Sequence, residues 1–148
     1  MRILIAEDEQ RTRQGLVRVL QSLGDEYEIV AQASNGKAAL EMILEQKPDV
    51  VFIDIKMPFM DGLSLSRIVR EEFPKTKILI ISGYDDFEYA RQAIEVGVDQ
   101  YLLKPVTRMK LKNVLLELKD KIEQDQEQED YRTQFQNCLL YTSPSPRD

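Results

Sequence analysis

The sequence predicts an α/β fold: a doubly wound, five-stranded parallel sheet with helices on both faces. Five short apolar runs recur in the first hundred residues, and a segment with the helical period of about 3.6 residues follows each. Four of the runs are apolar at successive positions, which is typical of strands buried on both faces of a parallel sheet. The runs are Ile3–Ala6, Tyr27–Ala33, Val50–Ile53, Ile78–Ile81 and Tyr101–Leu103.

Start and stop signals bound the five helices between and after these strands. The first helix ends at Gly24, the second runs from Asn35-Gly36 to before Pro48, the third ends near Phe73-Pro74, the fourth follows Asp85-Asp86 and the fifth begins around Thr107. Parallel strands joined by right-handed helical crossovers give a three-layer architecture. We therefore expect a flavodoxin-like fold with strand order 2-1-3-4-5 and five helices.

The composition limits the classes of function that the chain can have. Its 148 residues suit one domain with a short extension, and a net charge of −6 argues against nucleic-acid binding by this chain itself. No apolar run approaches the roughly 18–20 residues of a membrane helix. A single cysteine, Cys138, fits a reducing cytoplasm. Histidine is absent, so chemistry must depend on carboxylates, hydroxyls and lysines, with or without a hard cation.

Polar residues follow four of the five predicted strands where each strand ends. They are Glu7-Asp8, Asp54, Ser82 and Lys104-Pro105 after the first, third, fourth and fifth strands. In an open α/β sheet, ligands bind at the carboxyl ends of the strands, where the strand order reverses. In this order the reversal lies between the first and third strands, which supply the carboxylates.

These residue types support phosphoryl transfer aided by a metal. Three neighbouring carboxylates repel one another and must take up protons or a cation, and all-oxygen ligation suits Mg²⁺. A carboxylate such as Asp54 beside Mg²⁺ and Lys104 is an activated acceptor for a phosphoryl group. Each residue alone has a structural explanation as a helix cap, a turn residue or a surface charge. Their joint occurrence at the strand ends favours a site.

Four segments resemble the signature segments of response-regulator receiver domains from bacterial two-component systems. They are Ile5–Glu9, Asp54–Gly62, Ile81–Tyr84 and Tyr101–Pro105. The resemblance covers about Met1 to Ile122. It looks closest to receivers that precede an arabinose-regulator-type helix-turn-helix output domain.

The resemblance implies a metal-dependent phosphorylation site. A sensor histidine kinase would phosphorylate Asp54, and Mg²⁺ would be bound by Asp8, by Glu7 mostly through water, by Asp54, and by the backbone carbonyl of Lys56. The family frequently has Asp where this chain has Glu7, a change that matters little if water intervenes.

The resemblance also implies a two-state switch. Ser82, where Thr is common, would hydrogen-bond the phosphoryl group, Lys104 would pair with it, and Tyr101 would turn inward. Lys104-Pro105 would be a cis peptide. The face made by the fourth helix, fifth strand and fifth helix would then change shape, supporting a homodimer and an output in transcription. We thus expect a signalling switch that takes part in its own phosphotransfer and dephosphorylation, rather than an enzyme.

Side chains two residues beyond Asp54 and Ser82 bear on the lifetime of the phosphorylated state. Lys56 and Tyr84 are long enough to overhang an aspartyl-phosphate and to impede the attacking water. If they do, the phosphorylated state is long-lived; the alternative is that both side chains point to solvent.

Other functions on such a sheet fit the sequence less well. An aspartyl-phosphate phosphatase usually has a second acid two residues after its nucleophile, where this chain has Lys56, and it needs a cap domain. A flavodoxin-like electron carrier needs a phosphate-binding loop where Glu7-Asp8-Glu9 would repel phosphate. A pseudo-receiver should have lost Asp54 or Lys104. A stand-alone receiver acting through protein partners remains an alternative.

The sequence changes character after the receiver-like part, residues 1–122. Leu111, Leu115, Leu118 and Ile122 have the 4-3-4 spacing of a coiled-coil seam, which then fades into an acidic helical linker over residues 123–137. A frayed polar helix end is the alternative interpretation of this stretch. Residues 138–148 break abruptly from that pattern and resemble a translated sequencing adapter; a disordered native end is the alternative. We expect a non-native tail in place of an output domain, and we expect that output domain to bind DNA.

Overall fold

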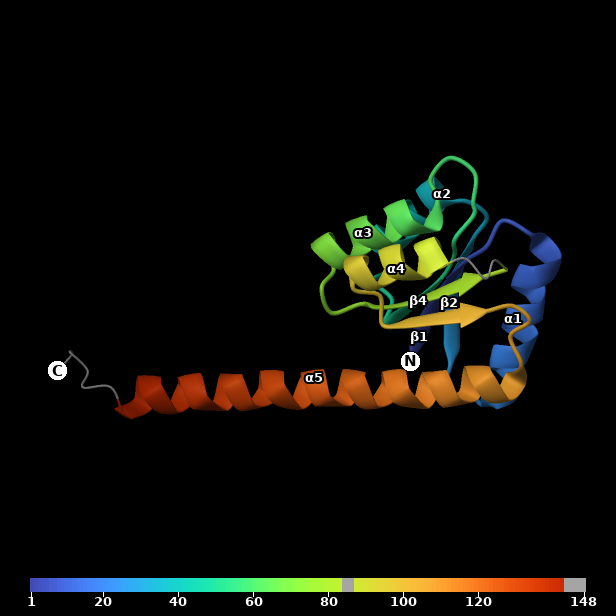
Figure 1. The fold of residues 1–148 in the computed structure, drawn as a ribbon. Coiled ribbons are helices and arrows are strands. Elements are labelled where there is room, and N and C mark those ends of the chain that lie inside the picture. The colour runs from blue at the N-terminus through green and yellow to red at the C-terminus, as the bar shows by residue number, and fades with distance from the viewer. Residues whose placement is uncertain (84–86, 143–148) are drawn as a thin grey trace.

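The structure is a computed structural model that describes residues 1–83 and 87–142, with side chains up to residue 137. Strands and helices alternate along the chain (Figure 1). The elements are β1 Arg2–Ala6, α1 Gln10–Leu23, β2 Glu28–Ala33, α2 Gly36–Gln46, β3 Val50–Asp54, α3 Gly62–Glu72, β4 Lys77–Ser82, α4 Phe87–Val96, β5 Gln100–Leu103 and α5 Arg108–Thr142. The five strands are parallel in the order β2-β1-β3-β4-β5, which confirms the predicted flavodoxin-like topology.

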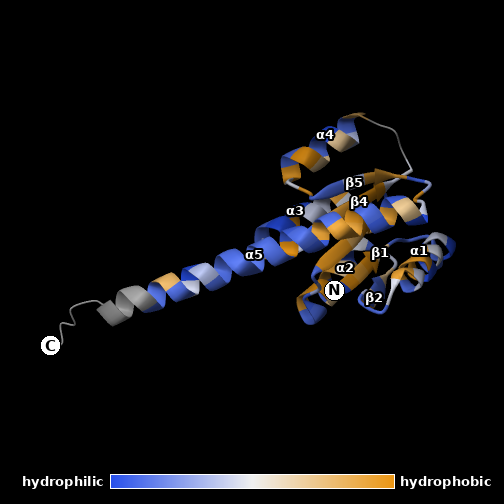
Figure 2. Cartoon of the chain, turned by 90° about the horizontal axis from the view of Figure 1, so that it is seen from below, coloured by the Kyte–Doolittle hydropathy of each residue, from blue (hydrophilic) through white to orange (hydrophobic). Residues whose placement is uncertain are grey.

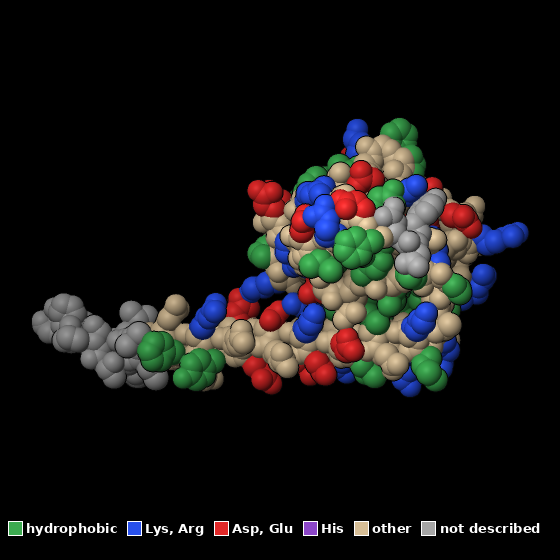
Figure 3. Space-filling view, in the orientation of Figure 1, with side chains coloured by type: hydrophobic (Ala, Val, Ile, Leu, Met, Phe, Trp, Pro, Cys, Tyr) green, Lys and Arg blue, Asp and Glu red, His purple; other side chains and the backbone are tan. Residues whose placement is uncertain are grey.

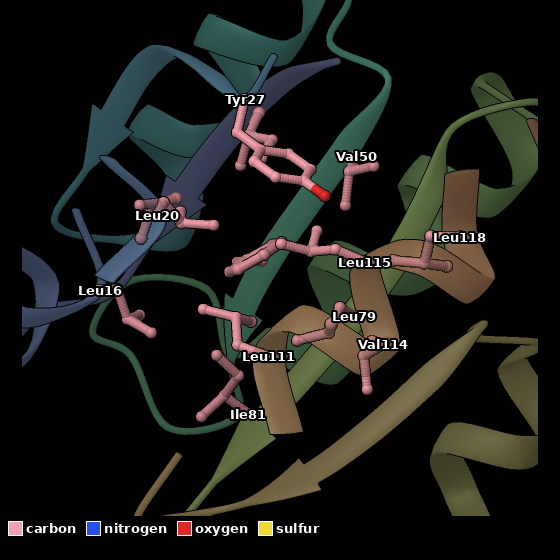
Figure 4. Packing of buried hydrophobic residues seen from close by; sticks show 13 residues of the cluster. Leu16, Leu20, Tyr27, Val50, Leu79, Ile81, Leu111, Val114, Leu115 and Leu118 are labelled. Atoms are coloured by element: carbon pink, nitrogen blue, oxygen red, sulfur yellow. The ribbon is translucent and has the colours of Figure 1, made fainter. Parts of the chain in front are cut away.

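Alternating side chains of the central strands face two separate cores, which explains the unbroken apolar runs in the sequence. On one face, strand residues pack against α1 and α5; Figure 4 shows this cluster, with Leu16 and Leu20 on one side and Leu111 and Leu115 on the other. On the opposite face, the intervening strand residues pack against α2 and α3. β1, β3 and β4 are almost fully buried, whereas β2 and β5, the edge strands, are only partly so.

Side chains cap the starts of α2, which was predicted at Asn35-Gly36, and of α3, whose start was not predicted. The Asn35 side chain accepts a hydrogen bond from the Ala38 N–H at 2.8 Å, and Asp61 accepts one from the Ser64 N–H at 2.8 Å. The predicted stop at Gly24 is also confirmed, since this residue ends α1 with φ 141°, a value that glycine tolerates. The cap at Asp61 matters most for function because it fixes the start of α3 next to the Asp54 backbone.

The coiled-coil interpretation of the α5 stripe is wrong for its first three residues. Leu111, Leu115 and Leu118 are fully buried in the core that α5 shares with α1 and the sheet, and Ile122 packs partly against that core. The 4-3-4 spacing therefore records packing of α5 onto its own domain.

Beyond Ile122, α5 continues as one helix. Residues 123–137 are helical, and the helix ends at Thr142. In Figure 2 this part is mostly hydrophilic, whereas the part of α5 beside the domain mixes apolar and polar residues. Residues 143–148 of the predicted tail lie outside the described residues, and the division into domain, linker and tail stays a prediction. Within residues 1–83 and 87–142, no helix is both long enough and apolar enough to cross a membrane.

Candidate functional site

Three carboxylates meet at the carboxyl ends of β1 and β3, as the topology predicts. One oxygen each from Glu7, Asp8 and Asp54 lies within 4.8 Å of the others. Glu7 is only 2% exposed and Asp54 9%, while Asp8 is exposed. Because β1 and β3 are paired neighbours, the sheet itself fixes the spacing of these acids.

Lys104 reaches the same point from the end of β5. Its Nζ donates to Glu7 Oε1 at 2.9 Å and lies 3.5 Å from Asp54 Oδ1. Its backbone N–H donates to the Ser82 carbonyl at 2.7 Å, which holds the β4 and β5 ends together. The peptide bond from Lys104 to Pro105 is cis, as the resemblance implied. Four of the residues singled out in the sequence thus converge on one site.

Burial and crowding shift the ionisation of these groups. Burial, together with the neighbouring Glu7 and Asp8, raises the pKa of Asp54 to about 7, although Lys104 opposes the rise. Burial would also raise the pKa of Glu7, but hydrogen bonds from Lys104, Asp54 and Asp8 outweigh it and hold that pKa below its ordinary value. Burial and Glu7 raise the pKa of Asp8. The site therefore carries more negative charge than Lys104 alone neutralises.

This excess charge and the donor atoms fit a hard divalent cation. Glu7, Asp8 and Asp54 offer only carboxylate oxygens, the ligand type that Mg²⁺ prefers. A cation among them would relieve the mutual repulsion that raises the pKa of Asp54. These three residues could hold such an ion.

The loop from β3 to α3 is held close beneath Asp54 by its backbone. The Gly62 N–H donates to the Ile55 carbonyl at 2.7 Å, and a Cβ on Gly62 would lie 2.2 Å from the Asp54 carbonyl oxygen. Only glycine fits this approach, which gives Gly62 a positioning role that the predicted site did not include. In the same loop Phe59 is 87% exposed and has φ 69°, uncommon for a bulky residue.

The predicted switch residues Ser82 and Tyr101 lie on the adjoining strands. Ser82 is fully buried at the end of β4, next to β5. Tyr101 is half-buried and packs against the core shared with α2 and α3. Its hydroxyl is buried and has no hydrogen-bond partner within the described part of the chain. A buried tyrosine hydroxyl usually finds a partner, so this side-chain position is energetically unfavourable for its polar end.

The Lys56 side chain lies beside the site. Its Nζ stands 5.8 Å from the centroid of the Tyr89 ring on α4. Both residues, with Asp8 and Asp61, line a cavity of about 560 Å³. Tyr84, the other residue expected to overhang Asp54, lies outside the described residues, so the predicted shielding stays a prediction.

Two contacts at the site could not be expected from the predicted elements alone. The Arg13 guanidinium donates to the Glu7 carbonyl at 2.7 Å, and Tyr89 receives Lys56. Arg13 lies about one turn into α1, six residues after Glu7, and no local pattern ties its side chain to that carbonyl. The Tyr89 contact depends on how α4 packs, which no local pattern encodes.

Known proteins are similar to this chain in both sequence and fold. The sequence profile described as the response regulator receiver domain matches residues 3–116. The transcriptional regulatory protein YesN of Bacillus subtilis is 37% identical over 124 residues, covering 80% of this chain and 33% of the relative. The transcriptional regulatory protein CitT of the same organism is 37% identical over 119 residues, covering 80% and 52%. The chain thus spans between a third and about half of these relatives.

Solved structures agree with the sequence comparison. The receiver domain of AraT, a response regulator from Geobacillus stearothermophilus, superposes with a TM-score of 0.78 at 42% identity, covering 84% of this chain and 97% of that one. The signal receiver domain of NarL from Mycobacterium tuberculosis gives a TM-score of 0.74 at 38% identity, covering 80% and 95%. The fold, the matched segments and the acidic site all agree. The chain belongs to the response regulator receiver domain family.

Proposed function

We propose that this chain accepts a phosphoryl group on Asp54, in a Mg²⁺-dependent reaction, from a phosphohistidine of a sensor kinase. The observation that carries the proposal is the convergence of Glu7, Asp8 and Asp54 within 4.8 Å, with the Lys104 ammonium beside them. Since the chain has no histidine, the phosphohistidine must come from a partner. With no histidine in the chain, the acceptor is another side chain at the site, and a carboxylate beside a cation and an ammonium is activated for that role.

The reaction exchanges one bond to phosphorus for another. An Asp54 carboxylate oxygen attacks the phosphorus atom, the nitrogen–phosphorus bond of the donor breaks, and the donor histidine keeps the electron pair. Glu7, Asp8, Asp54 and the Lys56 backbone carbonyl would hold Mg²⁺, which supplies neutralisation of the phosphoryl oxygens. Lys104, whose Nζ lies 3.5 Å from Asp54 Oδ1, contributes a second positive charge, and the chain's role is positioning and charge compensation.

We further propose that phosphorylation switches the face formed by α4, β5 and α5. An aspartyl-phosphate adds about two negative charges and three acceptor oxygens. These would draw Lys104 away from Glu7 and attract the Ser82 hydroxyl. Tyr101 would then change position, and its buried hydroxyl, which has no hydrogen-bond partner within the described part of the chain, supports such a change. The result is a population shift between two shapes of the face.

The same face has the apolar character that an association surface needs. Ile94 on α4 is 75% exposed, Leu103 on β5 37% and Leu116 on α5 46%. We propose that it forms a homodimer. The output is transcriptional, acting through a DNA-binding domain, because the relatives with this receiver are transcriptional regulatory proteins and are two to three times as long as the part matched.

The test uses a small-molecule phosphodonor, so that no kinase is needed. The protein is incubated with acetyl phosphate and Mg²⁺, with and without EDTA, and phosphoprotein is measured by intact mass. The expected result is phosphorylation that requires Mg²⁺ and that slows strongly in Asp8→Asn, which removes an anionic ligand. Equal phosphorylation in EDTA would contradict the metal-dependent mechanism.

A further inference from the structure

Residues 119–129 of α5 contact the amino edge of the sheet, where the strands begin, through charged side chains. Lys119 Nζ lies 3.4 Å from Glu26 Oε2, and Lys121 Nζ lies 3.8 Å from Asp99 Oδ1. One turn further, Asp125 Oδ2 lies 2.5 Å from Lys77 Nζ, and Glu129 then pairs with Lys75. Figure 3 shows side chains of both signs gathered where α5 passes beneath the domain.

The order of signs along the helix is matched by the domain. Two basic residues are followed by two acidic ones on α5, and they meet two acidic and then two basic residues of the domain. A slip of the helix by one turn would bring Asp125 to Asp99 and Glu123 to Glu26. Both new contacts would be repulsive, so the charge pattern disfavours this slip.

Beyond Ile122, the described polar contacts between the helix and the domain are the ion pairs of Asp125 and Glu129. Beyond Ile122 the helix stands off the domain over a cavity of about 530 Å³, which is lined by Pro48, Phe73 and Pro74 as well as by the paired charges. Lys77 is the inner anchor: only 7% of it is exposed, and buried lysines are rare unless they are paired. Its described side-chain ion pair is the one with Asp125.

We propose that these four ion pairs form a charge-matched ladder that docks residues 119–129 of α5 on the receiver. The helix therefore leaves the domain as a directed arm rather than as a flexible tether. The acidic stretch from residue 123 onward is then not only a solvated linker, because Asp125 and Glu129 recognise a basic patch made by Lys75 and Lys77.

The ladder is also connected to the face expected to change on phosphorylation. Asp99 joins α4 to β5, and it contacts Arg70 at 2.7 Å as well as Lys121. The next residue, Gln100, donates to Glu117 of α5 at 2.8 Å. If the proposed function holds, a movement of α4 and β5 would change the direction of the arm through these contacts; the docking itself requires no phosphorylation.

The test measures how narrowly the arm is held. Nitroxide labels are placed in the full chain at Glu41→Cys on α2 and Gln134→Cys on α5, in a Cys138→Ser background, and the distance distribution is measured by double electron–electron resonance at low salt. We expect a narrow distribution that broadens at high salt, since exposed ion pairs are screened.

Two matched variants separate the ladder from total charge. Asp125→Lys with Glu129→Lys should broaden the distribution, whereas Glu123→Lys with Glu127→Lys, which makes the same change in charge, should leave it narrow. Glu129→Lys alone should broaden it partly, and adding Lys75→Glu should restore it. A distribution as narrow in the first variant as in the unmodified chain, or equal broadening in both, would overturn the proposal. The distances are measured without a phosphodonor. The result therefore does not depend on whether Asp54 can be phosphorylated.

Discussion

The two edges of one sheet use the same charged residue types in opposite ways. At the carboxyl edge, three carboxylates face a single ammonium, and the pKa of Asp54 is raised to about 7 by burial and by its acidic neighbours. At the amino edge, charges occur in complementary pairs, such as Arg70 with Asp99 and Lys77 with Asp125. The paired edge serves structure and register.

The excess of negative charge at the carboxyl edge lowers the stability of the folded protein, which indicates a functional site. Like charges in a partly buried site persist only where another requirement maintains them, here the binding of a cation and a phosphoryl group. In this molecule, the charged cluster that balances internally is structural, whereas the cluster with an excess of negative charge is the candidate ligand site.

Gly62→Ala should distort the carboxyl edge most. Its Cβ would lie 2.2 Å from the Asp54 carbonyl oxygen, so the loop must shift and Asp54 with it. We expect a loss of about 2–4 kcal/mol in the free energy of unfolding, measured by urea denaturation, together with weaker phosphorylation. Gly15→Ala is the matched control, because nothing lies within 4 Å of a Cβ there, and it should stabilise α1 by about 0.5–1 kcal/mol. Equal effects at both glycines would refute the account of Gly62.

Removing the charge of Asp54 should stabilise the metal-free protein in a pH-dependent manner. Folding raises the pKa of this carboxyl from 3.8 to about 7, so its favourable contribution is present below pH 4 and is lost as the pH rises through 7. Asp54→Asn should therefore gain about 1–3 kcal/mol relative to the unmodified protein at pH 8 and little at pH 4. Unfolding free energies at the two pH values, in EDTA, measure this difference. A gain in stability that is the same at both pH values would show that ionisation of Asp54 is not its cause.

The amino edge should respond weakly to loss of its outermost pair. Lys75 and Glu129 are largely exposed, so Lys75→Ala should cost only about 0.2–0.5 kcal/mol at low salt and nothing measurable in 1 M salt. Glu129→Gln should cost a similar amount, and the double variant should cost less than the sum of the two. Strictly additive losses would mean that the pair does not interact.

Much of the fold could be predicted because its signals are local. Buried strands are apolar at successive positions, and Asn35 and Gly24 mark helix ends by their own chemistry. The stripe on α5 was ambiguous because the spacing of Leu111, Leu115 and Leu118 suits either a second helix or the domain's own sheet. Only the position of α5 over the core decides between these partners.

The candidate site was predictable in its membership but not in its contacts. Topology alone brings Glu7, Asp8, Asp54 and Lys104 to one edge. That Lys104 binds Glu7 at 2.9 Å depends on the local balance of charge, and the raised pKa of Asp54 depends first on its burial and then on its acidic neighbours. The exclusion of a side chain at Gly62 depends on the approach of α3 to β3, which emerges only in three dimensions.

Whether Asp54 is the phosphoryl acceptor is decided by comparing the intact masses of the unmodified protein and Asp54→Asn. Both are incubated with Mg²⁺ and acetyl phosphate under identical conditions. We expect the mass gain of one phosphoryl group in the unmodified protein and none in the variant, whose folding is verified by circular dichroism. The same gain in Asp54→Asn would contradict the assignment of Asp54 as the phosphoryl acceptor.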